Sequence, residues 1–135
     1  MKAYLGIKFH PDHRNRATIE RIAQILDANG FEAHCVVRDI ERWGEVQMTP
    51  HDLMAATFTL IRSCQLVVIE LTEKGVGLGI EAGYAHAQGI PIMTIAQNGS
   101  DISATLQGIS ADVFLYTDWD ELHNFFSGVN HKMCK

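Results

Sequence analysis

The chain has 135 residues, of which 47% are hydrophobic and 20% are charged, and its formal net charge is −5. This balance excludes an intrinsically disordered chain, a collagen-like repeat and a coiled coil. The negative charge argues against nucleic acid as a partner, and no apolar run approaches the roughly 20 residues of a membrane span. The N-terminus has no signal-peptide pattern and the three cysteines are widely spaced, so we expect reduced thiols in a cytoplasmic protein.

Apolar residues alternate between the period of strands and the period of helices along the chain. The first helix pattern has one apolar face at 19–26, and Gly30 follows as its stop. The next begins with a capping pair at 49–50, and a β-branched run at 66–69 is typical of a central buried strand. In chain order, the predicted elements are a strand at 4–9, a helix at 14–29, a strand at 31–37, a helix at 49–63, a strand at 66–69, a helix at 77–88, a strand at 91–95, a helix at 101–108, a strand at 113–116 and a helix at 118–126.

This alternation predicts one α/β domain over residues 1–135, built on a five-stranded parallel sheet with helices on both faces. A tail from about residue 128 follows the last helix pattern and is open to disorder. In such sheets, ligands bind beyond the carboxyl ends of the strands. Four loops are therefore candidates for a site: those after Phe9, Val37, Leu71 and Ala96.

A glycine-rich segment after the third strand is the most informative part of the sequence. Gly75, Gly77 and Gly79 stand at alternate positions, where glycine allows a tight turn and the close approach of a ligand. Glu81 follows in the first turns of a helix, either as a capping acid or as a nucleophile or base aimed into the cleft. A dinucleotide-binding fingerprint fits poorly, because five residues separate Leu71 from Gly77 and no acid ends the next strand.

The segment VGLGIEAGYAHAQG at 76–89 resembles the signature of the nucleoside 2-deoxyribosyltransferases and the related 2′-deoxynucleoside 5′-phosphate N-hydrolases. The segment SATLQG at 103–108 is similar to a short stretch of the nucleotide hydrolases, and Tyr4 stands where the family has a first-strand tyrosine. The resemblance covers residues 3 to about 120. It implies a flavodoxin-like fold and a homodimer or larger homo-oligomer in which a neighbouring subunit completes each site.

For Glu81, the resemblance implies attack of the carboxylate on C1′ of a 2′-deoxyribonucleoside, with Tyr4 in the same catalytic site. This is retaining glycosyl chemistry through a glycosyl-enzyme intermediate, and we expect no cofactor. Water or a second base then takes the sugar, and the departing base needs a proton or a hydrogen bond. The family places an aspartate on the helix before the third strand, but residues 55–57 of this chain have no carboxylate. The candidates for the missing acid are Asp52, Glu70 and Glu73.

Basic side chains gather where the first strand ends and the next helix begins. A helix N-terminus with nearby cations is a ready phosphate site. We therefore expect the substrate to be bound by Lys8, Arg14, Arg16 and the glycines Gly77 and Gly79.

Three further positions have two interpretations each. Ser103, by the resemblance, reaches the phosphate site of a neighbouring subunit, but it is also placed to cap the short helix that follows. Trp43, in the polar loop at 38–48, either stacks on a base or covers the core. Arg38 or Asp39 is a candidate for the cleft. The histidines form no i, i+4 pair and no cluster with cysteine, so we expect no metal site.

Together, these patterns favour cleavage of the N-glycosidic bond of a nucleoside or 2′-deoxynucleoside 5′-monophosphate, with Glu81 as the nucleophile. Exchange of bases by a nucleoside 2-deoxyribosyltransferase is the near alternative. A non-catalytic nucleotide-binding or sensor module also stays open, because the helix aspartate is missing.

Overall fold

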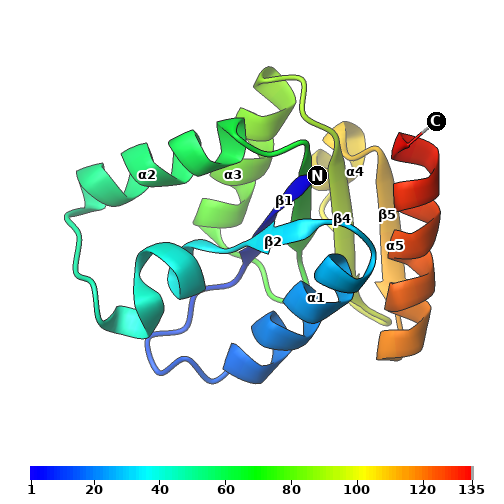
Figure 1. Cartoon of the computed structure of the whole chain (residues 1–135), viewed down its shortest axis with the longest axis horizontal. Coiled ribbons are helices and arrows are strands. Elements are labelled where there is room, and N and C mark those ends of the chain that lie inside the picture. Colours follow the sequence, from blue (N-terminus) through cyan, green and yellow to red (C-terminus); the bar gives the residue numbers. More distant parts are fainter. Residues whose placement is uncertain (135) are drawn as a thin grey trace.

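A five-stranded, all-parallel sheet forms the centre of the computed structural model, which describes residues 1–134. The strands are β1 (Lys2–Ile7), β2 (Glu32–His34), β3 (Leu66–Glu70), β4 (Ile92–Gln97) and β5 (Asp112–Tyr116). The helices are α1 (Arg16–Ala28), α2 (Pro50–Arg62), α3 (Val76–Ala87), α4 (Ala104–Ile109) and α5 (Trp119–Met133), with short turns η1 (Val36–Ile40) and η2 (Arg42–Gly44). The strand order is β2-β1-β3-β4-β5 (Figure 1), which confirms the predicted parallel α/β fold.

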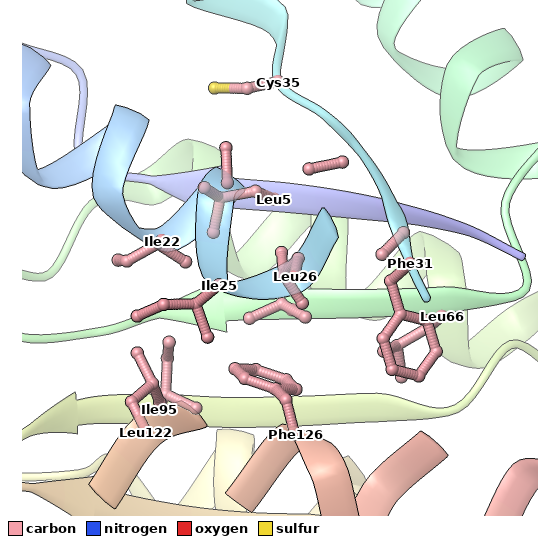
Figure 2. Close-up of a cluster of buried hydrophobic side chains, with 14 of the residues drawn as sticks. Leu5, Ile22, Ile25, Leu26, Phe31, Cys35, Leu66, Ile95, Leu122 and Phe126 are labelled. Atoms are coloured by element: carbon pink, nitrogen blue, oxygen red, sulfur yellow. The ribbon is translucent and has the colours of Figure 1, made fainter. Parts of the chain in front are cut away.

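Helices cover both faces of the sheet (Figure 1). α1 and α5 pack together on one face, and α2, α3 and α4 lie on the other. Under α1 and α5, side chains of the strands interlock with side chains of both helices (Figure 2). Labelled members of this core include Leu5, Leu66, Ile22, Leu26 and Phe126. Within residues 1–134, no helix is both long and apolar enough to cross a membrane.

Local sequence signals explain where several elements begin and end. The Thr49 hydroxyl accepts a hydrogen bond from the Asp52 N–H at 3.1 Å, and Pro50 occupies the first position of α2. Gly30 follows α1 with φ at 86°, a left-handed conformation that glycine adopts without strain. All five residues of β3 are buried, as expected for a central strand.

The second strand is shorter than its sequence pattern predicts. The pattern predicts a strand at 31–37, whereas β2 ends at His34 and Val36–Ile40 form a π-helical turn. Asp39 stabilises the turn, because its carboxylate accepts a hydrogen bond from the Cys35 N–H at 2.8 Å. Its own N–H donates to the Cys35 carbonyl, also at 2.8 Å. Because these two bonds use both the N–H and the carbonyl of Cys35, the strand pairing does not continue through this residue.

The last helix is longer than predicted. The pattern ends it at Phe126, but α5 continues to Met133, because Val129 is buried in the same cluster as α1. The expectation of a disordered tail from about residue 128 is therefore wrong as far as Met133. Lys135 lies outside the described residues.

Candidate active site

The predicted nucleophile and the predicted tyrosine are in direct contact. Tyr4 lies within β1, paired with Val67 of β3, and only 1% of it is exposed. Glu81 projects from the second turn of α3. The Tyr4 hydroxyl donates a hydrogen bond to Oε1 of Glu81 at 2.7 Å. A strand and a helix that are far apart in the sequence thus meet at one carboxylate.

The carboxylate reaches this place because β1 contains a glycine two residues after Tyr4. A Cβ at Gly6 would lie 2.6 Å from Oε2 of Glu81 and 3.0 Å from Cδ1 of Ile69, so a side chain there would displace the carboxylate. Gly6 is a site residue that sequence reasoning missed. The sequence does show a glycine inside a strand pattern, but its importance can be recognised only once the packing of α3 on β1 is known.

A cavity of about 340 Å³ opens beside this pair. β1 contributes its residues up to the loop at Phe9, and the other walls come from the segment after β2, from α2 and from α3. The walls are mostly apolar, as is typical of small-molecule sites. The polar side chains among them belong to Tyr4, Glu41, Thr57 and Glu81.

The electrostatics of the pair follow from its burial. Burial raises the pKa of Glu81 from 4.5 to about 7, and the hydrogen bond from Tyr4 limits the rise. Burial first, and the adjacent Glu81 second, raise the pKa of Tyr4 well above its ordinary value, so Tyr4 remains a donor. Oε2 of Glu81 is buried and has no hydrogen-bond partner within residues 1–134. The site thus holds a carboxylate that ionises near neutral pH and keeps one oxygen unpaired.

The glycines that precede Glu81 are not explained by packing within this chain. A Cβ at Gly77 or Gly79 would meet no atom within 4 Å, which excludes helix–strand packing as their purpose. Gly77 lines the cavity, whereas Gly79 lies on the exposed side of α3. Gly75 is the N-cap of α3, and a Cβ built there would lie 3.3 Å from Cδ and 3.5 Å from Nζ of Lys8.

The three basic residues predicted to bind phosphate lie apart. Lys8 is placed beside the start of α3. Nε of Arg14 donates to Nδ1 of His10 at 3.1 Å, and the Arg16 guanidinium lies 4.5 Å from the centroid of the Trp43 ring. In the described part of the chain, none of the three lines the cavity. Lys8 adjoins the N-terminus of α3, whereas Arg14 and Arg16 stand at the start of α1.

Ser103 occupies the N-cap of α4. Its hydroxyl accepts a hydrogen bond from the Leu106 N–H at 3.4 Å, which is the capping role considered from the sequence. Ser103 does not line the cavity of its own chain. A role at a neighbouring subunit stays a prediction.

The segment after β2 corrects two expectations. Arg38 and Asp39 pair with each other at 2.8 Å, and Arg38 also donates to the Ala33 carbonyl at 2.7 Å. Neither lines the cavity, so their expected place in the cleft is wrong. Trp43 packs against the core cluster under α1 and against His13, with ring centroids 5.7 Å apart. Of its two interpretations, the structure supports the one in which it covers the core.

The acids considered for the departing base are also elsewhere. Asp52 is exposed in the first turn of α2. Glu70 is buried, and its oxygens accept hydrogen bonds from a backbone N–H at 2.6 Å and from the Tyr116 hydroxyl at 3.0 Å. Glu73 lies 3.1 Å from the ring of His10. No group of three His, Cys, Asp or Glu side chains in residues 1–134 could hold a metal ion.

Of residues 55–57, the stretch in which the family pattern has an aspartate, one residue faces the cavity. Thr57 lines it, is 2% exposed and donates its hydroxyl to the Leu53 carbonyl at 2.8 Å. Within residues 1–134, the one carboxylate besides Glu81 that lines the cavity is Glu41, in the segment after β2. Sequence reasoning missed Glu41, although the polar loop at 38–48 indicated a functional segment there.

Comparison with known proteins identifies the family. A profile described as nucleoside 2-deoxyribosyltransferase matches residues 3–125. The chain belongs to the nucleoside 2-deoxyribosyltransferase family. A protein of Thermofilum pendens named as a 2′-deoxynucleoside 5′-phosphate N-hydrolase is 27% identical over 131 residues, covering 90% of this chain and 89% of that protein.

Solved structures share the fold of this family member. A 2-deoxyribosyltransferase of Bacillus psychrosaccharolyticus superposes with a TM-score of 0.75 at 14% identity, covering 96% of each chain. A CMP N-glycosidase of Clostridium botulinum gives a TM-score of 0.70 at 17% identity, covering 96% of this chain and 99% of that one. At such identities, the likeness shows the fold and confirms the deoxyribosyltransferase-like sheet.

Membership of the nucleoside 2-deoxyribosyltransferase family confirms the resemblance seen in the sequence, and with it the class of protein. This is an enzyme that acts on the N-glycosidic bond of nucleosides or nucleotides, by cleavage or by deoxyribosyl transfer. The roles of the individual residues remain predictions.

Proposed function

We propose that this enzyme hydrolyses the N-glycosidic bond of a 2′-deoxynucleoside 5′-monophosphate, with Glu81 as the nucleophile. The observation that carries the proposal is the Tyr4–Glu81 contact at 2.7 Å on the wall of a 340 Å³ cavity. A buried carboxylate with one oxygen held and the other unpaired is suited to attack an electron-poor carbon.

The chemistry assigns a part to each atom of the pair. The carboxylate of Glu81 forms a bond to C1′ as the C1′–N bond breaks, and the electron pair of that bond leaves with the base. Positive charge develops on the sugar in the transition state, and the carboxylate stabilises it. Tyr4 holds Oε1 and so keeps the carboxylate oriented. Water then attacks C1′ and releases both the sugar phosphate and Glu81.

A phosphorylated substrate is supported by the surroundings of the α3 N-terminus. Unpaired N–H groups and the helix dipole favour an anion there. Gly77 lies in this first turn and lines the cavity, and the Lys8 side chain adjoins the N-cap. We place the 5′-phosphate at this end of the cavity.

A self-association surface follows from the outward side of α3. Val76 is 84% exposed and Ile80 is 46% exposed, and Gly79 and Gly83 share their helical face. Such an apolar, smooth face is suited to close contact with a second copy. A homodimer that brings Ser103 of each subunit to its partner's site is part of this proposal.

The three cysteines are free thiols, which supports a reducing compartment such as the cytoplasm.

The test is release of free base from nucleosides and 5′-monophosphates, in the ribo and deoxy forms, with and without a second base as acceptor. We expect release from deoxynucleoside monophosphates without an acceptor, abolished in Glu81→Gln while the ligand still raises the melting temperature of that variant. Release only in the presence of an acceptor would instead assign transfer. Full activity of Glu81→Gln would contradict the proposed nucleophile.

A further inference from the structure

The departing base needs a proton, and α2 supplies no acid for this purpose. Residues 55–57, where the family has an aspartate, contain no carboxylate, and the one of them that lines the cavity, Thr57, donates its hydroxyl to a carbonyl of its own helix. Asp52, Glu70 and Glu73 do not line the cavity. Glu41 is the remaining carboxylate on its wall within residues 1–134, and it comes from a different element.

The backbone at Glu41 is fixed by three hydrogen bonds. Its N–H donates to the Val36 carbonyl at 2.9 Å, and its carbonyl accepts from the Gly44 N–H and the Val46 N–H, each at 3.0 Å. The first of these bonds closes the π-helical turn, a feature that is frequent at functional sites. The Glu41 side chain is therefore attached to a backbone position that hydrogen bonds hold in place at the cavity wall.

The residues that follow Glu41 are strained. Arg42 and Trp43 have φ at 48° and 57°, in the left-handed region that residues with a side chain rarely adopt. Contacts outside the segment hold this conformation, since Trp43 packs edge-on against His13 and beneath the guanidinium of Arg16. Strain that the surroundings enforce is typical of functional positions.

The charges along the cavity place the base at the Glu41 end. A phosphate dianion is favoured at the α3 N-terminus, beside Lys8, and is repelled by a carboxylate. Phe9 lines the cavity and is 54% exposed, so its ring face is available to stack on a base. Phe9 and Glu41 both neighbour His13, which puts them at one end of the cavity.

We propose that Glu41 is the general acid that protonates the departing base, in place of an acid on α2; this inference rests on the proposed function. As the C1′–N bond breaks, its electron pair moves to the base nitrogen, and the Glu41 carboxyl proton passes to the base. Water then attacks C1′ from the same side and gives a proton to the Glu41 carboxylate, which restores the acid. Base and sugar phosphate are the products, and one water is consumed.

The environment of Glu41 is compatible with this cycle. Burial raises the pKa of Glu41 above its ordinary value, and the charge of His13 opposes the rise. Neither of these influences is a hydrogen bond from another residue, so the carboxyl group is available to a ligand.

The experiment compares bases that differ in their need for a proton. Deoxynucleoside monophosphates with an ordinary purine or pyrimidine are matched with N7-methylated purine or 5-halogenated uracil counterparts, whose bases depart more easily. We expect Glu41→Gln to lower kcat by about 10²–10⁴-fold for the ordinary bases and far less for the activated ones. Glu45→Gln, an exposed neighbour in the same segment, should match the wild type.

Each outcome is decisive. An equal loss for both classes of base, or a rise in KM with kcat unchanged, would overturn the role of Glu41 as an acid. Failure of the proposed function is distinct, because the wild type would then release no base from any substrate, or Glu81→Gln would remain active. Thermal melting of each variant separates a loss of chemistry from a loss of folding.

Discussion

The carboxylate of Glu81 lies against β1 in surroundings that disfavour its charge, and its one donor is the Tyr4 hydroxyl. Burial raises the pKa of Glu81 and the hydrogen bond from Tyr4 limits the rise, so that the pKa is about 7. Nucleophilic attack needs the ionised form. The same burial also makes that form costly to the folded state.

Replacing Tyr4 with Phe should shift the pH dependence of the reaction. Without the hydroxyl, the pKa of Glu81 rises above about 7, because the hydrogen bond that lowered it is gone. The acidic limb of the kcat/KM profile, where activity falls as the carboxylate is protonated, should then move to higher pH. Profiles of the wild type and the variant test this, with Tyr84→Phe as a tyrosine control on α3. An unmoved limb, or one moved to lower pH, would contradict the role of Tyr4.

Glu81→Gln should change how stability depends on pH. The folded-state pKa of about 7 exceeds the reference value of 4.5, so the folded state holds a proton that the unfolded chain has lost between these two values. The free energy of unfolding of the wild type therefore falls as pH rises through this window, by about 3 kcal/mol from this group. The variant lacks the titration, so its advantage over the wild type should grow with pH. Urea unfolding across the window measures this difference, and a constant difference would refute the raised pKa.

Gly6→Ala should reduce activity and stability together. The added Cβ would meet Oε2 of Glu81 at 2.6 Å and Ile69 at 3.0 Å, so the carboxylate or the strand must shift. A small misplacement of a nucleophile costs much of its rate. Gly128→Ala is the control, because a Cβ there meets nothing within 4 Å. Base release and thermal melting of both variants provide the comparison, and a fully active Gly6→Ala would show that the carboxylate does not depend on this close approach.

At the residue scale, the sequence indicated the candidates that stand in local patterns and missed those that depend on packing, and the catalytic roles of all of them remain predictions. Glu81 follows a glycine-rich turn, and Tyr4 matches a family position, so both were identified from sequence and lie together in the structure. Gly6 and Glu41 belong to the same site only because α3 crosses β1 and the segment after β2 folds back. Neither the packing of α3 on β1 nor the path of the segment after β2 can be predicted from the residues next to Gly6 or Glu41 in the sequence.

At the scale of elements, α3 has three differently used faces. Leu78, Ala82 and Ala85 are buried, Glu81 faces β1 and the cavity, and the face with Gly79 is exposed. Glycine in a helix interior is destabilising by about 0.5–1 kcal/mol relative to alanine. Contacts within a single chain do not explain a glycine on this exposed face of the helix.

Gly79→Ala should therefore stabilise the monomer and weaken self-association. The Cβ meets nothing within 4 Å in the chain, so the helix should gain about 0.5–1 kcal/mol. In the proposed dimer, the added methyl group would force the two α3 helices further apart and so weaken their contact. Unfolding at high dilution and sedimentation across a concentration series measure the two effects separately. A variant that is stabilised and associates as the wild type does would remove Gly79 from the interface.

Helix and strand prediction was least accurate at the two ends of the alternation. The apolar run at 31–37 resembles a strand, but hydrogen bonds from Asp39 end β2 early. In α5, Val129 follows Phe126 at the ordinary i, i+3 spacing of a helical face, but Gly128 between them is typical of a helix end and so concealed the continuation to Met133. The sheet itself was predictable, because each strand pattern is followed by a helix that must cross over it.

At the scale of the whole molecule, the two helical layers differ in the apolar side chains that they leave exposed to solvent. α1 and α5 bury one face of the sheet with a continuous core, whereas α3 on the other face presents Val76 and Ile80 to solvent. An enzyme that shares its sites between subunits requires such an exposed region close to the cavity.

Ile80→Asp should convert the proposed dimer into a monomer without unfolding it. The side chain is 46% exposed in the single chain, so a charge there is solvated in the monomer and buried in the dimer. If a partner completes the site, activity should fall in parallel with association. Sedimentation and base release measured on one preparation test both, with Leu115→Asp, a 37% exposed position on β5, as the control. An active, monomeric wild type would contradict the assembly.

The position of β1 in the middle of the sheet has a consequence for biosynthesis. The carboxylate that Tyr4 contacts is 77 positions later in the chain, so the two groups meet only when α3 packs against β1. A ribosome-bound fragment that ends before α3 lacks Glu81, the proposed nucleophile, and local opening of β1 separates the pair. In the proposed mechanism, cleavage of the glycosidic bond is thereby restricted to chains in which β1 and α3 have already packed together.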